Sequence, residues 1–383
     1  MSRAVRWGLT LLLGAVLVGI ALGWRNYLLP TRLPPHLAHY SATWPGENNV
    51  IRDELRALGS NAVPALVANL NSRSWADVPW IQRVRDKLPS SWADFLPNDN
   101  AFQWRRQSTL WVLGELGSNA LPAIPTLELY RDGATHHEHR TATVIALAKI
   151  QPNDSQARSN LADLLLNGGQ GERFWVAWEF GAVPVRTSED LAPLLSALSD
   201  TDQEVQANAT ISVARFGPLA APAVPRLRQL LTNDYKHAPV GAAYALASIG
   251  RDYVPETLVV MTNAIVKQLQ FADYIAPLYF KAAGTSAARA LPFLTTLSER
   301  NPGGWADRAV VLVSPHPTEK AIRRLGDLVE LEPSDIELLG SLGAAAQPVV
   351  RRLQRIAEQS PYATLRAAAR RAVERIQAKS KPE

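Results

Sequence analysis

A short phrase recurs along the chain and constrains its fold more than any other feature. It reads LGSNAVPAL at 58–66, LGSNALPAI at 116–124, FGPLAAPAV at 216–224, IGRDYVPET at 249–257 and LGAAAQPVV at 342–350. In each copy a glycine precedes a proline by five residues, and a sixth copy at 283–294 places Pro292 eight residues after Gly284. A phrase repeated at a regular period indicates that one structural unit is stacked many times.

Each copy of the phrase predicts a pair of antiparallel helices. Alanine-rich segments before the glycine, such as RTATVIALAKI, carry apolar residues at helical spacing. The glycine is expected to end this first helix in the left-handed conformation, which costs it no Cβ clash. The proline is expected in or near the first turn of a second helix, where backbone N–H groups have no internal acceptor. One pair cannot bury both apolar faces, so the units must stack into a solenoid.

Weaker junctions complete the series at Leu88-Pro89, Ile150-Gln151, Phe180-Gly181 and Val313-Ser314. The anchor positions are then 59, 89, 117, 151, 181, 217, 250, 284, 314 and 343, spaced 28 to 36 residues apart. The sequence therefore predicts an all-α, right-handed α-solenoid of about ten helical hairpins over residues 46–378, followed by a basic tail at 379–383.

The phrase LG-x-x-A-x-P-x-L between paired helices resembles the HEAT repeats, in their short-period bacterial form, over about residues 50–378. The resemblance implies binding of another macromolecule along a groove lined by the second helices. We therefore expect a non-catalytic scaffold with a protein partner, no cofactor and no small-molecule substrate. A minority of the family carries enzymatic sites, so a lyase-type or glycosylase-type site in the groove is the alternative.

The N-terminal segment predicts a membrane anchor. Residues 7–24 (WGLTLLLGAVLVGIALGW) carry no charge, and as a helix they would be about 27 Å long, close to the roughly 30 Å hydrocarbon core of a bilayer. Arg3 and Arg6 precede this run and Arg25 follows it. The slight excess of positive charge on the N-terminal side places that end in the cytoplasm.

The same segment divides the chain into an anchor over 1–29, a proline-containing spacer over 30–45, and a repeat domain outside the cytoplasm, in the periplasm if the source is bacterial. Ala21-Leu22-Gly23 resembles a signal-peptide cleavage site. Cleavage there would make the repeat domain a secreted protein, and the sequence leaves this alternative open.

Tryptophans concentrate in the least regular part of the repeat region, where five of eleven lie between 75 and 111. Because amphipathic aromatic side chains are enriched at binding hot spots, Trp75, Trp80 and Trp92 are expected to bind a protein partner. The tryptophans on predicted helices are expected to fill the core: Trp104, Trp111, Trp175 and Trp178.

Positive charge gathers at the C-terminal end. Residues 351–383 contain nine Lys or Arg and three Glu, so this segment carries +6 and the remainder sums to −1. Arg226 and Arg352 each lie four residues after their repeat proline, which predicts equivalent positions on second helices, and with Arg355 they are expected to contact the protein partner. The basic helix could also bind phosphate groups, but a polar terminal cap is the preferred interpretation and nucleic acid is not an expected partner.

Neither of the two motifs that suggest a ligand predicts a metal or phosphate site. His136, His137 and His139 lack the i, i+4 spacing of a zinc-binding helix and are expected in a solvated turn. The glycine-rich stretch 167–171 follows a helix and lacks the lysine of a phosphate-binding loop, so it is expected to be a connector. The chain contains no cysteine, which excludes thiolate metal sites and disulfides.

Overall fold

The computed structural model describes residues 56–71, 83, 87, 99–133, 137–184, 187–233, 237–328 and 331–378. Every element in these ranges is a helix, which confirms the predicted all-α class. The predicted anchor at 1–29, the spacer at 30–45, the Leu88-Pro89 junction and the tail at 379–383 lie outside these ranges. Within the ranges, no helix is both long and apolar enough to span a bilayer.

The helices alternate between two layers. The first helices of successive pairs are α7 (Asp99–Leu116), α9 (His137–Ile150), α11 (Gln170–Glu179), α13 (Gln203–Arg215), α15 (His237–Ile249), α17 (Gln270–Ala283), α19 (Trp305–Val313) and α21 (Pro333–Ser341). The second helices are α4 (Val63–Asn71), α8 (Ile124–Gly133), α10 (Ser155–Asn167), α12 (Ser188–Ala197), α14 (Val224–Leu230), α16 (Val254–Val266), α18 (Leu291–Arg300), α20 (Glu319–Gly326) and α22 (Val350–Gln359). Helix α23 (Ala363–Ala378) closes the array and packs on α21 and α22.

The predicted junctions fall between the two helices of each pair. Short 3-10 helices connect most of them: η2 (Gly59–Ala62), η4 (Gly117–Ala123), η5 (Phe180–Ala182), η6 (Gly217–Ala223), η7 (Arg251–Tyr253), η8 (Gly284–Ala290) and η9 (Gly343–Val349). The anchor glycine is left-handed in five copies, with φ between 52° and 58°: Gly59, Gly117, Gly217, Gly284 and Gly343. In η4, η6 and η9 the repeat proline stands inside the 3-10 helix, as Pro222 does, with one residue between it and the start of the second helix. The connection η8 contains no proline, and Pro292 lies in the first turn of α18.

The expectation of a left-handed glycine is wrong at Gly250. Its φ is −167°, which is extended backbone that any residue can adopt. The connection that follows is the short η7, and a Cβ at residue 250 would lie 3.3 Å from the ring of Tyr253. A larger residue at 250 is therefore disfavoured by the close approach of the Tyr253 ring and not by the backbone angle.

Small side chains bring the first helices close together. From α7 to α19 each first helix packs on the next, and in each of α13 and α15 nine of the thirteen residues are buried. A Cβ on Gly241 of α15 would clash with the Thr210 side chain of α13, and a Cβ on Gly340 of α21 would lie 2.9 Å from Ala372 Cα of α23. Close backbone approach in this layer follows from the alanine, glycine, serine and threonine content of these helices.

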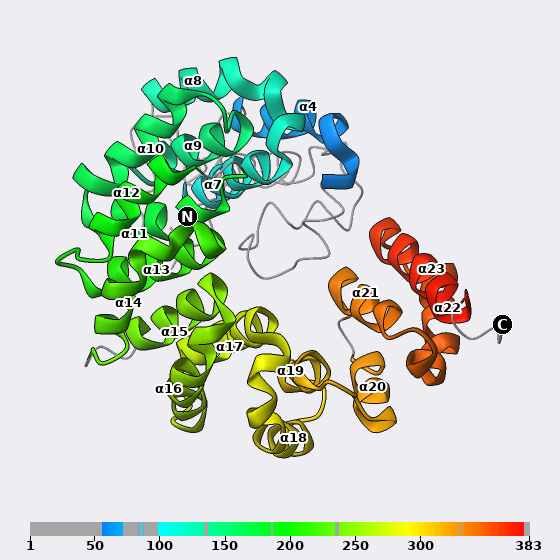
Figure 1. Cartoon of the computed structure of the whole chain (residues 1–383). Coiled ribbons are helices and arrows are strands. Elements are labelled where there is room, and N and C mark those ends of the chain that lie inside the picture. The colour runs from blue at the N-terminus through cyan, green and yellow to red at the C-terminus, as the bar shows by residue number, and fades with distance from the viewer. Residues whose placement is uncertain are drawn as a thin grey trace, which may run out of the picture.

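The array curves toward its first helices. In Figure 1 the second helices α8, α10, α12, α14, α16 and α18 follow the outer side of the curve, and the first helices follow the inner side. The expectation that second helices line the groove is therefore wrong here. The direction of curvature follows from side-chain size. Helices pack closer together in a layer of small side chains than in a layer of large ones, so the stack bends toward the layer of small side chains.

A series of ion pairs joins consecutive first helices near their C-terminal ends. Lys149 Nζ of α9 lies 2.8 Å from Glu115 Oε1 of α7 and 2.6 Å from Glu179 Oε2 of α11, and Arg56 Nη2 lies 2.7 Å from Glu115 Oε2. Burial lowers the pKa of Lys149, but the two carboxylates more than offset this and raise it above its ordinary value. Because a misplaced register would leave a buried charge unpaired, these contacts fix how the units stack.

The hydrophobic core is a strip that follows the array. Its buried residues form two clusters, one reaching from Ala62 to Ile249 and the other from Ile211 to Ile376, which meet at α13 and α15. Each helix packs mainly on helices one or two positions away in the chain. This is the arrangement expected of a solenoid, in which stability comes from each unit and its interfaces with adjacent units.

Candidate functional site

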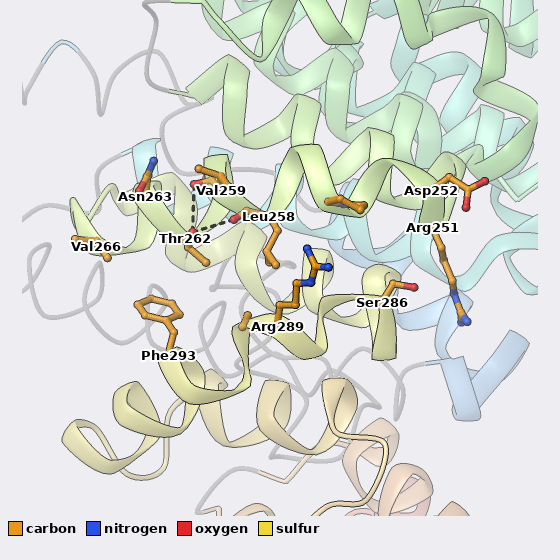
Figure 2. A pocket seen from close by; sticks show the side chains of 12 residues that line it. Arg251, Asp252, Leu258, Val259, Thr262, Asn263, Val266, Ser286, Arg289 and Phe293 are labelled. Carbon is orange, nitrogen blue, oxygen red and sulfur yellow. Dashed lines mark hydrogen bonds between the residues drawn. The ribbon is translucent and has the colours of Figure 1, made fainter.

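A trough of about 830 Å³ lies on the outer layer between α16 and the segment formed by η8 and α18. The residues that line it from α16 are Pro255, Leu258, Val259, Thr262, Asn263 and Val266, and those from η8 and α18 are Ser286, Arg289, Ala290 and Phe293. These positions recur every three or four residues, so one face of each helix forms one wall. Arg251 and Asp252 of η7 complete one end (Figure 2).

Apolar side chains form most of the middle and one end of the trough. Leu258 and Phe293 are half-buried against the core, whereas Val259 is 61% exposed and Val266 is 67% exposed. In Figure 2 Phe293 and Val266 lie at the end opposite Arg251. Exposed valines on two helical turns leave an apolar surface that water covers in the free protein, and removal of that surface from water would favour binding.

The other end of the trough carries charge. Arg251, Asp252 and Arg289 are exposed, and in the described part of the chain neither arginine forms an ion pair or hydrogen bond. Figure 2 shows Arg289 reaching toward the middle of the trough and Arg251 and Asp252 extending in different directions from η7. The three side chains together give this end a net charge of +1.

The tryptophans predicted to bind a partner, Trp75, Trp80 and Trp92, lie outside the described residues. Trp111 is buried, as expected of a core residue. Trp178 of α11, also expected in the core, is only half-buried. The centroid of its ring lies 5.2 Å from that of Tyr274 on α17, although α13 and α15 are the first helices between them in the chain.

The predicted equivalence of Arg226 and Arg352 agrees with their contacts. Arg226 Nε donates to Leu198 O at 3.2 Å, and Arg352 Nη2 donates to Leu328 O at 2.8 Å. Leu198 directly follows α12, and Leu328 lies two residues after the end of α20. Each acceptor thus belongs to the end of the preceding second helix. Both guanidinium groups therefore bridge consecutive units. Arg355 of α22 is exposed.

The remaining motifs have structural roles. His139, expected in a solvated turn, is instead buried in the first turn of α9, where its Nδ1 lies 3.1 Å from Tyr130 Oη. The stretch 167–171 connects α10 to α11, as predicted, and Glu172 accepts a hydrogen bond from Gly169 N at 2.8 Å. No group of three potential metal ligands occurs among the described residues.

The trough residues were missed by sequence reasoning, although the sequence of α16 carries a signal. Its core-facing residues are Val254, Thr257, Met261, Ala264 and Ile265. Val259 and Val266 fall outside that stripe, so α16 is apolar on a second face as well. A second apolar face on an outer helix predicts a surface that another molecule can cover.

Comparison with protein-family profiles and with curated proteins gives no match. Among solved structures, the chain is similar to an engineered protein with 17% sequence identity and a TM-score of 0.36, over 86% of this chain and 99% of that one. It is also similar to importin beta, crystallised in an ammonium sulfate condition, with 15% identity and a TM-score of 0.35. That match covers 92% of this chain and 55% of importin beta, so the chain spans about half of that protein.

Proposed function

We propose that this chain is a non-catalytic, HEAT-like scaffold, a right-handed solenoid of about ten helical hairpins that binds another protein on its outer face. The observation that supports this most is the trough between α16 and α18, where apolar side chains remain exposed on two packed helical elements. A preformed surface loses little conformational entropy on binding, so more of the contact energy appears as affinity.

The chemistry of the trough favours binding over catalysis. Its charged groups are Arg251, Asp252 and Arg289, so the lining offers one carboxylate and no histidine, lysine or tyrosine as a proton donor or acceptor. A general acid–base mechanism needs a group whose pKa lies near the working pH. The lyase-type or glycosylase-type alternative would therefore need a site elsewhere on the array.

Photo-crosslinking in intact cells tests the proposal. A benzoylphenylalanine placed at Val259 should capture a discrete protein, and the same residue at Leu129 of α8, which is 77% exposed and outside the trough, serves as the matched control. Capture at Val259 and not at Leu129 is the expected result. Identical products from both positions, or none from Val259, would contradict outer-face binding at the trough.

We further propose that residues 7–24 tether this scaffold to a membrane with the repeats on the extracytoplasmic side. The uncharged run and its flanking arginines support this. Protease added to intact spheroplasts should digest residues 40–383, and complete protection of the repeats would reverse the topology. A mature chain that lacks residues 1–23 would instead support cleavage and secretion.

We propose two further sets of protein contacts outside the trough: Arg226, Arg352 and Arg355, and the tryptophans Trp75, Trp80 and Trp92. Substitution of the three tryptophans by alanine tests this set, because a secondary contact should weaken capture at Val259 without abolishing it. Unchanged capture would remove the tryptophans from the binding surface.

The basic C-terminal end is a second candidate site, for phosphate groups. Arg351, Arg355, Arg370 and Arg375 on α22 and α23 are exposed, and they form no ion pair within the described ranges. Binding through these side chains should appear as salt-dependent retention on heparin that is lost when all four are changed to glutamine. Equal retention of the variant would exclude the patch.

A further inference from the structure

We infer that the trough binds an extended peptide segment of a partner protein, with a carboxylate at one end of the segment and apolar side chains at the other. This inference rests on the proposed function and specifies the chemistry of the partner. It follows from a comparison of the trough with the other contacts between consecutive outer helices.

At most of those contacts a cation of one unit meets an acceptor of the next. The ion pairs are Arg158–Asp190 between α10 and α12, Arg228–Glu256 between α14 and α16, and Lys320–Glu299 between α20 and α18. Arg226 and Arg352 bridge α12 to α14 and α20 to α22 through backbone carbonyls. The array thus repeatedly supplies an internal partner for an outer-layer cation.

At the contact between α16 and α18 two arginines are present, but no carboxylate or carbonyl of the described residues pairs with them. Arg251 and Arg289 both line it, and neither has an ion-pair partner in the described part of the chain. Asp252 lies at the same end but does not pair with either side chain. A carboxylate from a bound partner would supply the missing charge, and such pairs at an interface favour the matching partner over others.

The two units that meet here are also the two with an irregular junction, one in its sequence and the other in its backbone. Arg289 occupies the fifth position after Gly284, where the other strong copies have proline. Arg251 follows Gly250. Among the described glycines of the six copies of the phrase, only Gly250 has an extended backbone. The two irregular junctions, at Gly250 and Gly284, therefore lie beside the unpaired cations Arg251 and Arg289.

The shape of the trough favours an extended peptide. Pro255 and Val266 are separated by 11 residues of α16, or roughly 17 Å, which is the length of about five extended residues. Val259 and Val266 are more than half exposed, so the trough is open along its length. Sites for small ligands usually enclose most of the ligand surface, whereas an open trough suits a chain that enters and leaves at its ends.

Selection from a displayed library of random hexapeptides, against the full chain, tests the inference. The wild-type protein should enrich peptides with Asp or Glu toward one end and Leu, Ile, Val or Phe toward the other. The double variant Arg251→Glu/Arg289→Glu should enrich Lys or Arg in place of the acids. Arg300→Glu, an exposed residue of α18 outside the trough, is the matched control and should leave the selected set unchanged.

A synthetic copy of the most enriched peptide gives the affinity. Arg289→Glu should weaken its binding by about tenfold and Arg300→Glu should not; far-UV circular dichroism confirms that both variants fold. No enrichment, enrichment without acids, or the same peptides from wild type and the double variant would overturn the inference. If Val259 still captures a protein in cells in that case, outer-face binding stands and only the carboxylate chemistry fails.

Discussion

Replacement of Gly217 by alanine isolates the backbone role of the repeated glycine. Gly217 begins η6 with φ of 55°, and a Cβ built there meets only Ser248 O, at an ordinary contact distance of 3.7 Å. The cost is therefore conformational: about 1–2 kcal/mol for the left-handed backbone, reduced by roughly 0.5 kcal/mol because alanine also restricts the unfolded chain. We expect a net loss of about 1 kcal/mol.

Gly171 provides the matched control. It is the second residue of α11, and a Cβ there has no atom within 4 Å. Because alanine favours helix over glycine, Gly171→Ala should leave stability unchanged or raise it by up to about 1 kcal/mol. Urea unfolding followed by far-UV circular dichroism measures both variants, and hydrogen exchange of the α13 and α14 amides shows whether the Gly217 effect is local. Equal effects of the two variants would refute the backbone role.

Two further predictions concern buried polar groups. Lys149→Met leaves Glu115 and Glu179 without their shared cation and should cost about 3 kcal/mol near pH 7. Because the pKa of Lys149 is raised, its contribution in the wild type is present below the unfolded-state lysine pKa of about 10.4 and is lost as the pH rises through the higher folded-state pKa. Urea unfolding near pH 7 and at alkaline pH checks both effects. Burial raises the pKa of Tyr279 to about 12 despite its hydrogen bond with Thr257. Ultraviolet titration should therefore show one tyrosine that ionises late, and Tyr279→Phe should remove it; a wild-type titration without that tyrosine would contradict the burial. The variant should lose only about 1 kcal/mol of stability, because Thr257 keeps its backbone acceptors.

The helix pairs could be predicted from sequence because the determinants are local. A glycine such as Gly217 must end a helix in the left-handed region, and the apolar periodicity on each side gives the two helices. Gly250 shows the limit of this reasoning: its neighbours match the phrase, yet the position of the Tyr253 ring decides its role. That contact depends on packing and cannot be derived from the phrase.

The direction of curvature and the trough depend on distances between layers. Gly241 and Thr210 are 31 residues apart in sequence, and only their close packing shows how near α13 and α15 lie. The resemblance implied the opposite layer for the groove. Likewise, the exposed apolar face of α16 is visible in the sequence, but the absence of an acceptor for Arg289 within the described residues emerges only when α16 and α18 are placed side by side.

Cysteine crosslinking most directly tests the central claim, that the hairpins stack in the order of the sequence. The native chain has no cysteine, so introduced pairs react without background. Arg228 Nη2 lies 3.1 Å from Glu256 Oε1, and Lys320 Nζ lies 2.6 Å from Glu299 Oε1. Each of these ion pairs joins two consecutive outer helices. Cysteines at either pair should crosslink with a short reagent, and a pair at Arg228 and Glu299 should not. Efficient crosslinking of that skipped pair, or failure of both neighbouring pairs, would contradict the account.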